Sequence, residues 1–283
     1  MYAVIGVRFR NATPCAGDER SVDALLDSGV LNVAGHPPTV YTPTLDGLSL
    51  SSDVPTNIGM LNRRIADMVA DIRGSGQRVL LIGGDCTHTT GVYAGLLQAH
   101  GPAARIGLVW FDAHGDFNTT QTTLSGMLGG MPVAVCAGLT LPQWRNAAGI
   151  HTPLATNRIV MVDVRNLDAA EETLIRATDV RVVACEQDAV THAMHRLLED
   201  VDLVYLHIDE DILDARYVPN HGTAEPNGPD MAQVQAAIRA VADVAGDKLV
   251  AMALVSVYNA GPGADVSVAS GIELLQAMRA SWQ

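Results

Sequence analysis

Short runs of aliphatic and β-branched residues alternate with helix-forming stretches along most of the chain. The runs are nearly continuous rather than alternating in polarity, as expected for strands buried on both faces of a parallel sheet. The pattern therefore predicts an α/β fold whose central parallel sheet is covered by helices on both faces. Strands are expected at Ala3–Val7, Arg78–Ile82, Ile106–Phe111, Arg158–Val164, Val180–Cys185, Leu203–Ile208 and Leu249–Ser256. Helices are expected between them, for example at Asn57–Arg73, Ala170–Ala177, Ala189–Leu198 and Asp230–Val244.

A single domain covering residues 1–283 is the simplest organisation for this pattern. Alternating α/β folds of this size commonly remain single units, and no repeat, low-complexity tract or change of composition marks a boundary. No apolar stretch reaches the length of about 20 residues that is needed to cross a bilayer. The opening MYAVIGVRF lacks the basic region and cleavage site of a secretory leader. We therefore expect it to form a strand of a cytoplasmic protein.

The charge balance argues against a nucleic-acid surface and favours a small ligand, for which positive charge would suit the acidic chain. The formal net charge is −13, and a single lysine, Lys248, accompanies seventeen arginines. Phosphate binding requires clustered positive charge, which this composition does not offer. The cysteines Cys15, Cys86, Cys136 and Cys185 are scattered without CxxC pairing, so no disulfide framework is expected. The expected partner is a small molecule, with neither nucleic acid nor membrane.

Three of the predicted strands end in polar residues that an ordinary turn does not require. These segments are IGGDC at Ile82–Cys86, FDAHGD at Phe111–Asp116 and HIDED at His207–Asp211. The carboxyl ends of strands in an open parallel sheet border the ligand crevice. The three segments can therefore converge on one place although they lie far apart in the sequence.

The carboxylates and the imidazole of these motifs have the spacing of a metal site. Residues two apart on an extended segment face the same side, so Asp112 can point with His114, and Asp209 with Asp211. Asp116 curls back from the following loop. Four such carboxylates would repel one another if no cation were bound, and oxygen-rich ligation suits manganese-type ions. Bridging carboxylates would hold two ions roughly 3.5–4 Å apart.

A simpler interpretation exists for each of these residues. An aspartate at the end of a strand is often a turn former or a helix N-cap, and a lone DxD motif is more often structural than catalytic. The coincidence of three motifs favours the metal site. His88, His192, His195 and His221 lack such neighbours and are interpreted as surface or packing residues. His207 abuts the cluster, so it either supports a metal ligand or packs in the core.

The segments VLLIGGDC, WFDAHGDFNT and LHIDEDILD, in this order, resemble the ureohydrolase family of arginase, agmatinase and formiminoglutamase. The resemblance covers most of the chain and implies a three-layer α/β/α fold. It also implies a homo-oligomer and a dimanganese centre whose bridging hydroxide attacks a guanidine carbon. One ion would be held by Cys86, Asp112, Asp116 and Asp209, and the other by Asp112, His114, Asp209 and Asp211. Asp116 would also act in catalysis, by holding the water and accepting its proton.

Three positions depart from the family pattern. Cys86 stands where the motif normally reads GGDH, and a thiolate is softer than imidazole and must first be deprotonated. Manganese binding at the Cys86 site is therefore expected to be weaker. Gly129 occupies the position of the proton-shuttling histidine of arginases, and Val257 that of the glutamate that binds the guanidinium group. The two last changes concern the guanidine end of a substrate.

The positions for the amino-acid end of a substrate match the family. Asn118 and Ser125 match residues that receive the α-carboxylate in arginases. Asp168 and Glu171 match residues that receive the α-amino group. Each could alone be an ordinary loop or helix residue. Together they favour an α-amino acid substrate over agmatine.

A substrate with a modified guanidine reconciles the retained and the missing groups. An oxygen on a guanidine nitrogen makes the group less basic than arginine, so it needs a carboxylate partner less. The pattern is similar to the branch of the family that hydrolyses Nω-hydroxy-L-arginine to L-ornithine and hydroxyurea in antibiotic biosynthesis. A divergent arginase or agmatinase is one alternative. A non-catalytic metal-binding homologue is another, but decay would be less selective than the changes seen here.

Overall fold

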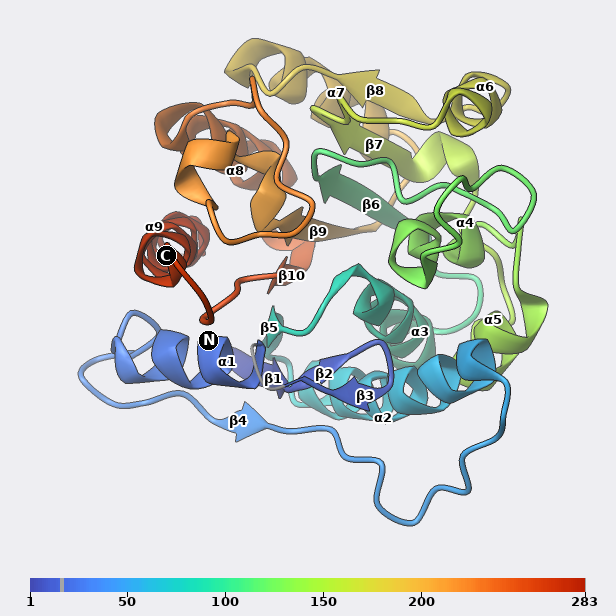
Figure 1. Cartoon of the computed structure of the whole chain (residues 1–283), viewed down its shortest axis with the longest axis horizontal. Coiled ribbons are helices and arrows are strands. Elements are labelled where there is room, and N and C mark those ends of the chain that lie inside the picture. The colour runs from blue at the N-terminus through green and yellow to red at the C-terminus, as the bar shows by residue number, and fades with distance from the viewer. Residues whose placement is uncertain (16–17, 283) are drawn as a thin grey trace.

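The computed structural model describes residues 1–15 and 18–282, and a parallel sheet lies at its centre (Figure 1). The strands of this sheet are β1 (Tyr2–Val7), β4 (Val40–Tyr41), β5 (Arg78–Gly83), β6 (Ile106–Phe111), β7 (Ile159–Val162), β8 (Arg181–Val183), β9 (Leu203–Asp209) and β10 (Leu249–Val255). Their order is β4-β1-β5-β10-β9-β6-β7-β8, and every neighbouring pair is parallel. A short antiparallel hairpin of β2 (Phe9–Arg10) and β3 (Thr13–Pro14) follows β1.

Helices cover both faces of the sheet, as the sequence predicts. Successive residues of β1 point to opposite faces, with Val4 in one apolar core and Ile5 in the other. The core on the side of Val4 is closed by α1 (Asp18–Asp27), α7 (Gln187–Leu198), α8 (Met231–Ala245) and α9 (Ala264–Ala280). The core on the side of Ile5 is closed by α2 (Val54–Gly74), α3 (Thr89–His100), α4 (Pro132–Cys136), α5 (Pro142–Ala148) and α6 (Ala169–Arg176). The fold is therefore the predicted three-layer α/β/α arrangement.

Element boundaries differ from the predicted ones for local reasons. Helix α2 begins at Val54 rather than Asn57, because the side chain of Asp53 accepts a hydrogen bond from the Thr56 amide and caps the helix earlier. Strand β7 ends at Val162 rather than Val164, since Asp163 adopts a left-handed φ of 65°. Strand β8 is likewise shorter than expected.

No helix of the described residues is both long enough and apolar enough to cross a membrane.

The centre of the sheet brings the polar motifs together. Strands β5, β10, β9 and β6 are consecutive in the sheet, so their carboxyl ends share one edge. The chain leaves β5 through Gly83, whose φ is 77°. A Cβ atom at Gly83 would lie 2.3 Å from a methyl group of Val22, so only glycine fits this turn. The turn directs the residues after β5 towards the ends of β9 and β6.

Candidate metal centre

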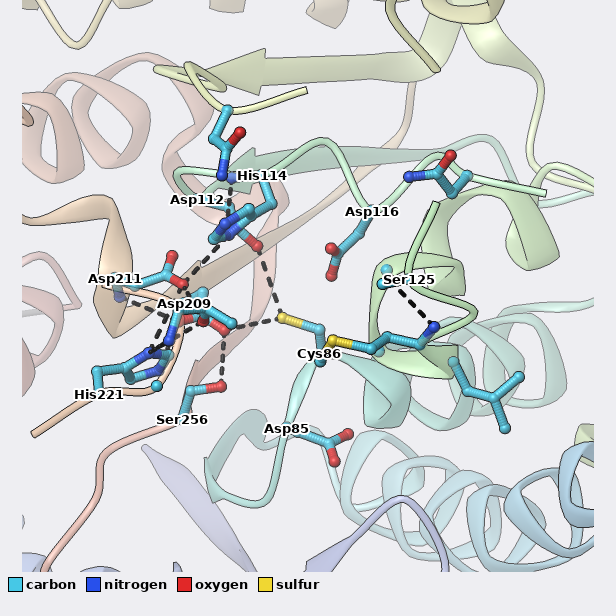
Figure 2. Close-up of a pocket in the computed structure, with 18 of the residues that line it drawn as sticks. Asp85, Cys86, Asp112, His114, Asp116, Ser125, Asp209, Asp211, His221 and Ser256 are labelled. Atoms are coloured by element: carbon cyan, nitrogen blue, oxygen red, sulfur yellow. Dashed lines mark hydrogen bonds and ion pairs between the residues drawn. The ribbon is translucent and has the colours of Figure 1, made fainter. Parts of the chain in front are cut away.

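The three motifs surround a cavity of about 450 Å³ at the carboxyl edge of the sheet (Figure 2). Cys86 follows β5, Asp112 and His114 follow β6, and Asp209 ends β9. Strand β10 contributes Ser256, which the motifs did not indicate and whose Oγ donates a hydrogen bond to Asp209 Oδ2 at 2.7 Å. Side chains from four adjacent strands therefore meet in one cavity.

One group of potential ligands consists of Cys86, Asp112 and Asp116. Each offers one ligand atom, and the three atoms lie within 4.8 Å of one another. The sulfur of Cys86 is 3.6 Å from Asp112 Oδ2 and 3.0 Å from Asp209 Oδ2. Asp116 has a left-handed φ of 46°, which accompanies the predicted return of the loop towards the cluster. These residues are three of the four that the resemblance assigns to the first ion, the fourth being Asp209.

A second group consists of Asp112, His114 and Asp211, again with ligand atoms within 4.8 Å. His114 Nδ1 lies 3.2 Å from Asp112 Oδ1 and 3.2 Å from Asp211 Oδ2. Asp112 therefore directs one carboxylate oxygen towards His114 and the other towards Cys86. His114 Nε2 faces Glu225 Oε1 at 3.7 Å, the kind of carboxylate contact that orients a metal-binding histidine.

Burial and mutual repulsion dominate the electrostatics of these groups. Burial raises the pKa of Asp112 well above its usual range, and the neighbouring charges of Asp211, Asp116 and Asp209 raise it further. Burial likewise raises the pKa of Asp116 well above its usual range, although the charge of His114 opposes this. The pKa of the Cys86 thiol is raised well above its ordinary value by burial and by the charge of Asp209.

Divalent cations fit this set of donors. Buried carboxylates that raise one another's pKa gain most from positive charge placed between them. Burial lowers the pKa of His114, but its contacts with Asp112 and Asp211 outweigh burial and raise the pKa. Cation binding must displace these protons, so we expect binding to strengthen as pH rises. The Cys86 sulfur is the donor that suits a manganese-type ion least.

His207 both packs in the core and contacts a candidate ligand. Its ring stacks on Trp110 with centroids 3.9 Å apart, and its Nδ1 lies 2.8 Å from Thr89 Oγ1. Its Nε2 lies 3.4 Å from Cys86 Sγ. Burial keeps the pKa of His207 well below its ordinary value. A neutral ring therefore lies directly behind the cysteine. The structure shows the core-packing role, and support of a metal ligand stays a prediction.

His221 is buried and packs against Tyr258, but the prediction that it has no neighbours in the acidic cluster is wrong. Its side chain lines the cavity, with Nε2 3.8 Å from Asp209 Oδ1 and Nδ1 3.9 Å from Asp211 Oδ2. These three residues form a further group with ligand atoms within 4.8 Å. The loop 219–229 folds back over the cavity because Asn220 Nδ2 donates to the carbonyl oxygens of Tyr258 and Ala260. The available signal was the position of His221 in a Gly- and Pro-containing loop that follows the third motif.

The other histidines agree better with their interpretation. His88 is fully buried, and its Nε2 lies 3.2 Å from the carbonyl oxygen of Phe9. His192 and His195 are exposed on α7.

The residues expected at the amino-acid end also line the cavity. Figure 2 shows one of them, Ser125, on the side of the cavity away from His221. Asn118 Nδ2 donates to Asp168 Oδ2 at 3.2 Å, which ties the loop after β6 to the start of α6. The two oxygens of Glu171 accept the amides of Phe117 and Asp168. Glu171 is therefore committed to capping α6 and positioning the loop. Asp168 Oδ2 also accepts a hydrogen bond from the Leu124 amide at 3.0 Å, and Ser125 Oγ accepts one from the Met127 amide at 3.2 Å.

The wall expected to bind the guanidine end has an unexpected composition. Gly129 lines the cavity, and a Cβ atom there would meet no other described atom within 4 Å. Val257 is fully buried in the core and is absent from the described residues that line the cavity. The flanking residues Ser256 and Tyr258 line it instead. Ser256 adopts a left-handed φ of 61° at this point. The wall thus presents hydroxyl and aromatic groups where the family pattern predicts a carboxylate.

The α/β/α fold and the acidic cluster at the carboxyl edge of its sheet place the protein in a class of α/β proteins. Members of this class carry a candidate site for two metal ions at that edge. The sequence profile described as "Arginase family" matches residues 3–278, so the chain belongs to the arginase family.

Relatives agree with this assignment. Arginase from Bacillus caldovelox is 31% identical over 169 residues, which cover 57% of this chain and 56% of that protein. Arginase from Entamoeba histolytica is 32% identical over 176 residues, covering 59% and 58%. The matched segments thus span less than two thirds of either relative. Arginase from Glaciozyma antarctica is 28% identical over 298 residues, covering 96% of this chain and 84% of that protein.

Solved structures show the same fold. The arginase of Entamoeba histolytica in complex with L-ornithine is 22% identical, superimposes with a TM-score of 0.85 and covers 99% of both chains. The arginase of Bacillus caldovelox is 24% identical, with a TM-score of 0.82 over 98% of this chain and 97% of that one.

Proposed function

We propose that the protein hydrolyses Nω-hydroxy-L-arginine to L-ornithine and hydroxyurea with two manganese ions. Cys86, Asp112, Asp116 and Asp209 would hold one ion, and Asp112, His114, Asp209 and Asp211 the other. The convergence of these six side chains around one cavity supports the assignment. Two such ions, when bound, supply the positive charge that makes water acidic enough to act as a nucleophile near neutral pH.

The protein's own residues supply binding, orientation and proton transfer. Ser125 and Asn118 would bind the α-carboxylate, and Asp168 the α-ammonium group, with Glu171 holding their loop in place. Asp116 would orient the water and accept its proton. The water oxygen bonds to the central carbon of the hydroxyguanidine, and the bond from this carbon to the δ-nitrogen breaks. The δ-nitrogen takes up the proton and leaves as part of L-ornithine.

The choice of substrate rests on the residues that form the cavity wall expected to bind the guanidine end. Arginine would bring a permanently charged guanidinium to a wall of Ser256, Tyr258 and His221 rather than to a glutamate. Burying a charge without an opposing partner is unfavourable. A hydroxylated guanidine is less basic and carries an oxygen, so it avoids much of this cost.

The substrate assay measures ornithine release from Nω-hydroxy-L-arginine, L-arginine and agmatine by the manganese-loaded protein. We expect kcat/KM for Nω-hydroxy-L-arginine to exceed that for arginine by ten- to a hundredfold. This factor corresponds to about 1.4–2.8 kcal/mol of differential transition-state stabilisation, roughly the size of one buried charge contact. Agmatine should react poorly, because it lacks the carboxylate that Ser125 and Asn118 would bind. Equal kcat/KM values for arginine and its hydroxylated form would contradict the proposal.

Plain arginine hydrolysis is the second candidate, since the relatives named above are arginases. The same assay separates the two, because an arginase would need no hydroxyl group on its substrate.

Exchange of the cysteine ligand tests the metal assignment. Cys86→His should tighten manganese binding by about tenfold, or roughly 1.4 kcal/mol, because imidazole suits the ion better than a buried thiol. The raised pKa of the Cys86 thiol means that metal must displace a proton, so wild-type affinity should increase with pH more steeply than that of the variant. Titration of metal-free protein with manganese at two pH values gives both quantities.

The partly exposed Cys15 provides the matched control, and Cys15→His should bind manganese like the wild type. Unchanged affinity in Cys86→His would remove Cys86 from the proposed ligands.

A further inference from the structure

We infer that His221 donates a hydrogen bond from Nε2 to the hydroxyl oxygen of the substrate, and that this contact selects a hydroxyguanidine over a guanidine. The inference rests on the proposed function and assigns a specificity role to a residue outside the family motifs. Its basis is an unpartnered, buried polar atom at the wall of the cavity.

The neighbouring backbone determines which nitrogen of the His221 ring carries a hydrogen. The amide nitrogen of Thr223 lies 3.3 Å from His221 Nδ1, and its hydrogen points at this atom. An amide N–H can only donate, so Nδ1 accepts and carries no hydrogen of its own. The Thr223 hydroxyl, which can rotate, lies 3.1 Å from both His221 Nδ1 and Asp211 Oδ2 and can donate to either. A ring without a hydrogen on Nδ1 carries it on Nε2.

This Nε2–H group has no hydrogen-bond partner among the described residues, although it is buried. Asp209 Oδ1, at 3.8 Å, is too far away for a hydrogen bond. A buried donor without an acceptor costs free energy, and such groups in native proteins usually have a ligand or a water as partner. Because His221 lines the cavity, a bound substrate can supply that acceptor.

The ring is held in a defined orientation. Tyr258 packs edge-on against His221, with centroids 4.6 Å apart and an interplanar angle of 72°. The guanidinium carbon of Arg10 lies 5.6 Å from the centre of the Tyr258 ring. Asn220, next to His221, is fastened to the carbonyl oxygen of Tyr258. Figure 2 shows the result, with His221 beside Asp209 and Asp211 and on the other side of Cys86 from Ser125.

Donor and acceptor chemistry makes this group selective. The guanidinium of arginine has five N–H donors and no acceptor, so it cannot receive a hydrogen bond from Nε2–H. The hydroxyl oxygen of a hydroxyguanidine accepts one. Sites built to hydrogen-bond one polar group discriminate strongly against an analogue that lacks it, because the buried partner is then left unsatisfied. With the hydroxylated substrate the Nε2–H group of His221 has an acceptor, whereas with arginine this buried donor stays unsatisfied.

The experiment compares His221→Phe with the wild type, because phenylalanine keeps a planar ring against Tyr258 and removes the N–H. We expect kcat/KM for Nω-hydroxy-L-arginine to fall at least tenfold, while the value for L-arginine does not fall. Manganese content by elemental analysis and L-ornithine affinity by calorimetry should be unchanged, since neither involves Nε2. His221→Gln, which restores an N–H donor, should recover part of the preference. His192→Phe, an exposed histidine on α7, is the matched control.

Each outcome decides the inference. The inference is supported if His221→Phe has a smaller kcat/KM preference for Nω-hydroxy-L-arginine over arginine at full metal content, and if His221→Gln recovers part of that preference. Loss of one manganese ion, or equal losses with both substrates, would overturn it and make His221 a metal ligand or a structural residue. If the wild type itself shows no preference for the hydroxylated substrate, the proposed function fails, and this is visible before any variant is tested. A preference kept by both His221 variants overturns the inference alone.

Discussion

Asp112→Asn is expected to lose both metal ions and to lower kcat/KM for Nω-hydroxy-L-arginine at least a thousandfold. This factor corresponds to about 4 kcal/mol of transition-state stabilisation. The reason is that Asp112 directs one oxygen towards Cys86 and the other towards His114, so both candidate ion positions depend on its charge. Asparagine retains an oxygen that can accept the His114 amide, which donates to Asp112 Oδ1 at 2.7 Å. The fold should therefore persist without the metals.

The metal-free state of this variant should be more stable than that of the wild type at pH 8. Burial raises the pKa of Asp112 in the folded protein, so the unfolded chain loses this proton first as pH increases. Stability from the protonated carboxyl is therefore present below the ordinary carboxylate pKa of about 3.9 and declines as pH rises above it. Asparagine has no proton to lose. Urea unfolding of chelator-treated proteins should show a larger advantage of the variant at pH 8 than at pH 5.

Asp202→Asn is the control for this prediction. Asp202 precedes β9 at the opposite edge of the sheet and pairs with Arg105 at the surface, where its side chain is 54% exposed. Its replacement should leave turnover unchanged and alter stability little, because exposed ion pairs contribute little to the free energy of unfolding. Normal metal content and activity in Asp112→Asn would refute the shared-ligand assignment.

Val257→Glu is expected to destabilise the protein by more than about 3 kcal/mol and to confer no arginine hydrolysis. An alignment alone suggests the opposite, because a glutamate at this position would restore the family's guanidinium partner. In the structure, however, Val257 is fully buried in the core. A Cβ atom at Gly271 would lie 3.1 Å from Val257 and 3.2 Å from Glu210 Oε1, so Val257 and Glu210 adjoin the same glycine.

Glu210 makes this position particularly intolerant of a second carboxylate. Its side chain is fully buried, and its contact with the backbone of Gly271 does not offset the cost of burial. Burial, together with the charges of Asp209 and Asp211, raises the pKa of Glu210 well above its usual range. A glutamate at position 257 would add a second buried acid beside it. Denaturant unfolding and an arginine assay measure the two expected effects.

Tyr258→Glu is the matched comparison for stability, because the neighbouring side chain faces the cavity rather than the core. It should destabilise the fold much less than Val257→Glu. A stable Val257→Glu protein with new arginase activity would show instead that the introduced side chain reaches the cavity.

The sequence by itself determined the layers of the fold and the edge that carries the cavity. Runs of buried residues such as Ile106–Phe111 mark strands locally, and the handful of polar residues directly after them is brought together by parallel topology alone. Asp112, His114 and Asp116 could therefore be placed without coordinates. The division into one domain stays a prediction, as do the ligand and substrate-binding roles.

Only the tertiary structure decided which way the side chains beyond the strand ends point. The left-handed backbone at Ser256 accompanies the placement of Val257 in the core, and the residue's position in an alignment does not reveal this. The carboxylate of Glu171 accepts hydrogen bonds from two backbone amides, one of them in a loop 54 residues away in sequence. His221 reaches the cavity because its loop is fastened to the residues after β10. Strand patterns are local, whereas loop paths depend on contacts between distant segments, and for that reason the sequence left these directions open.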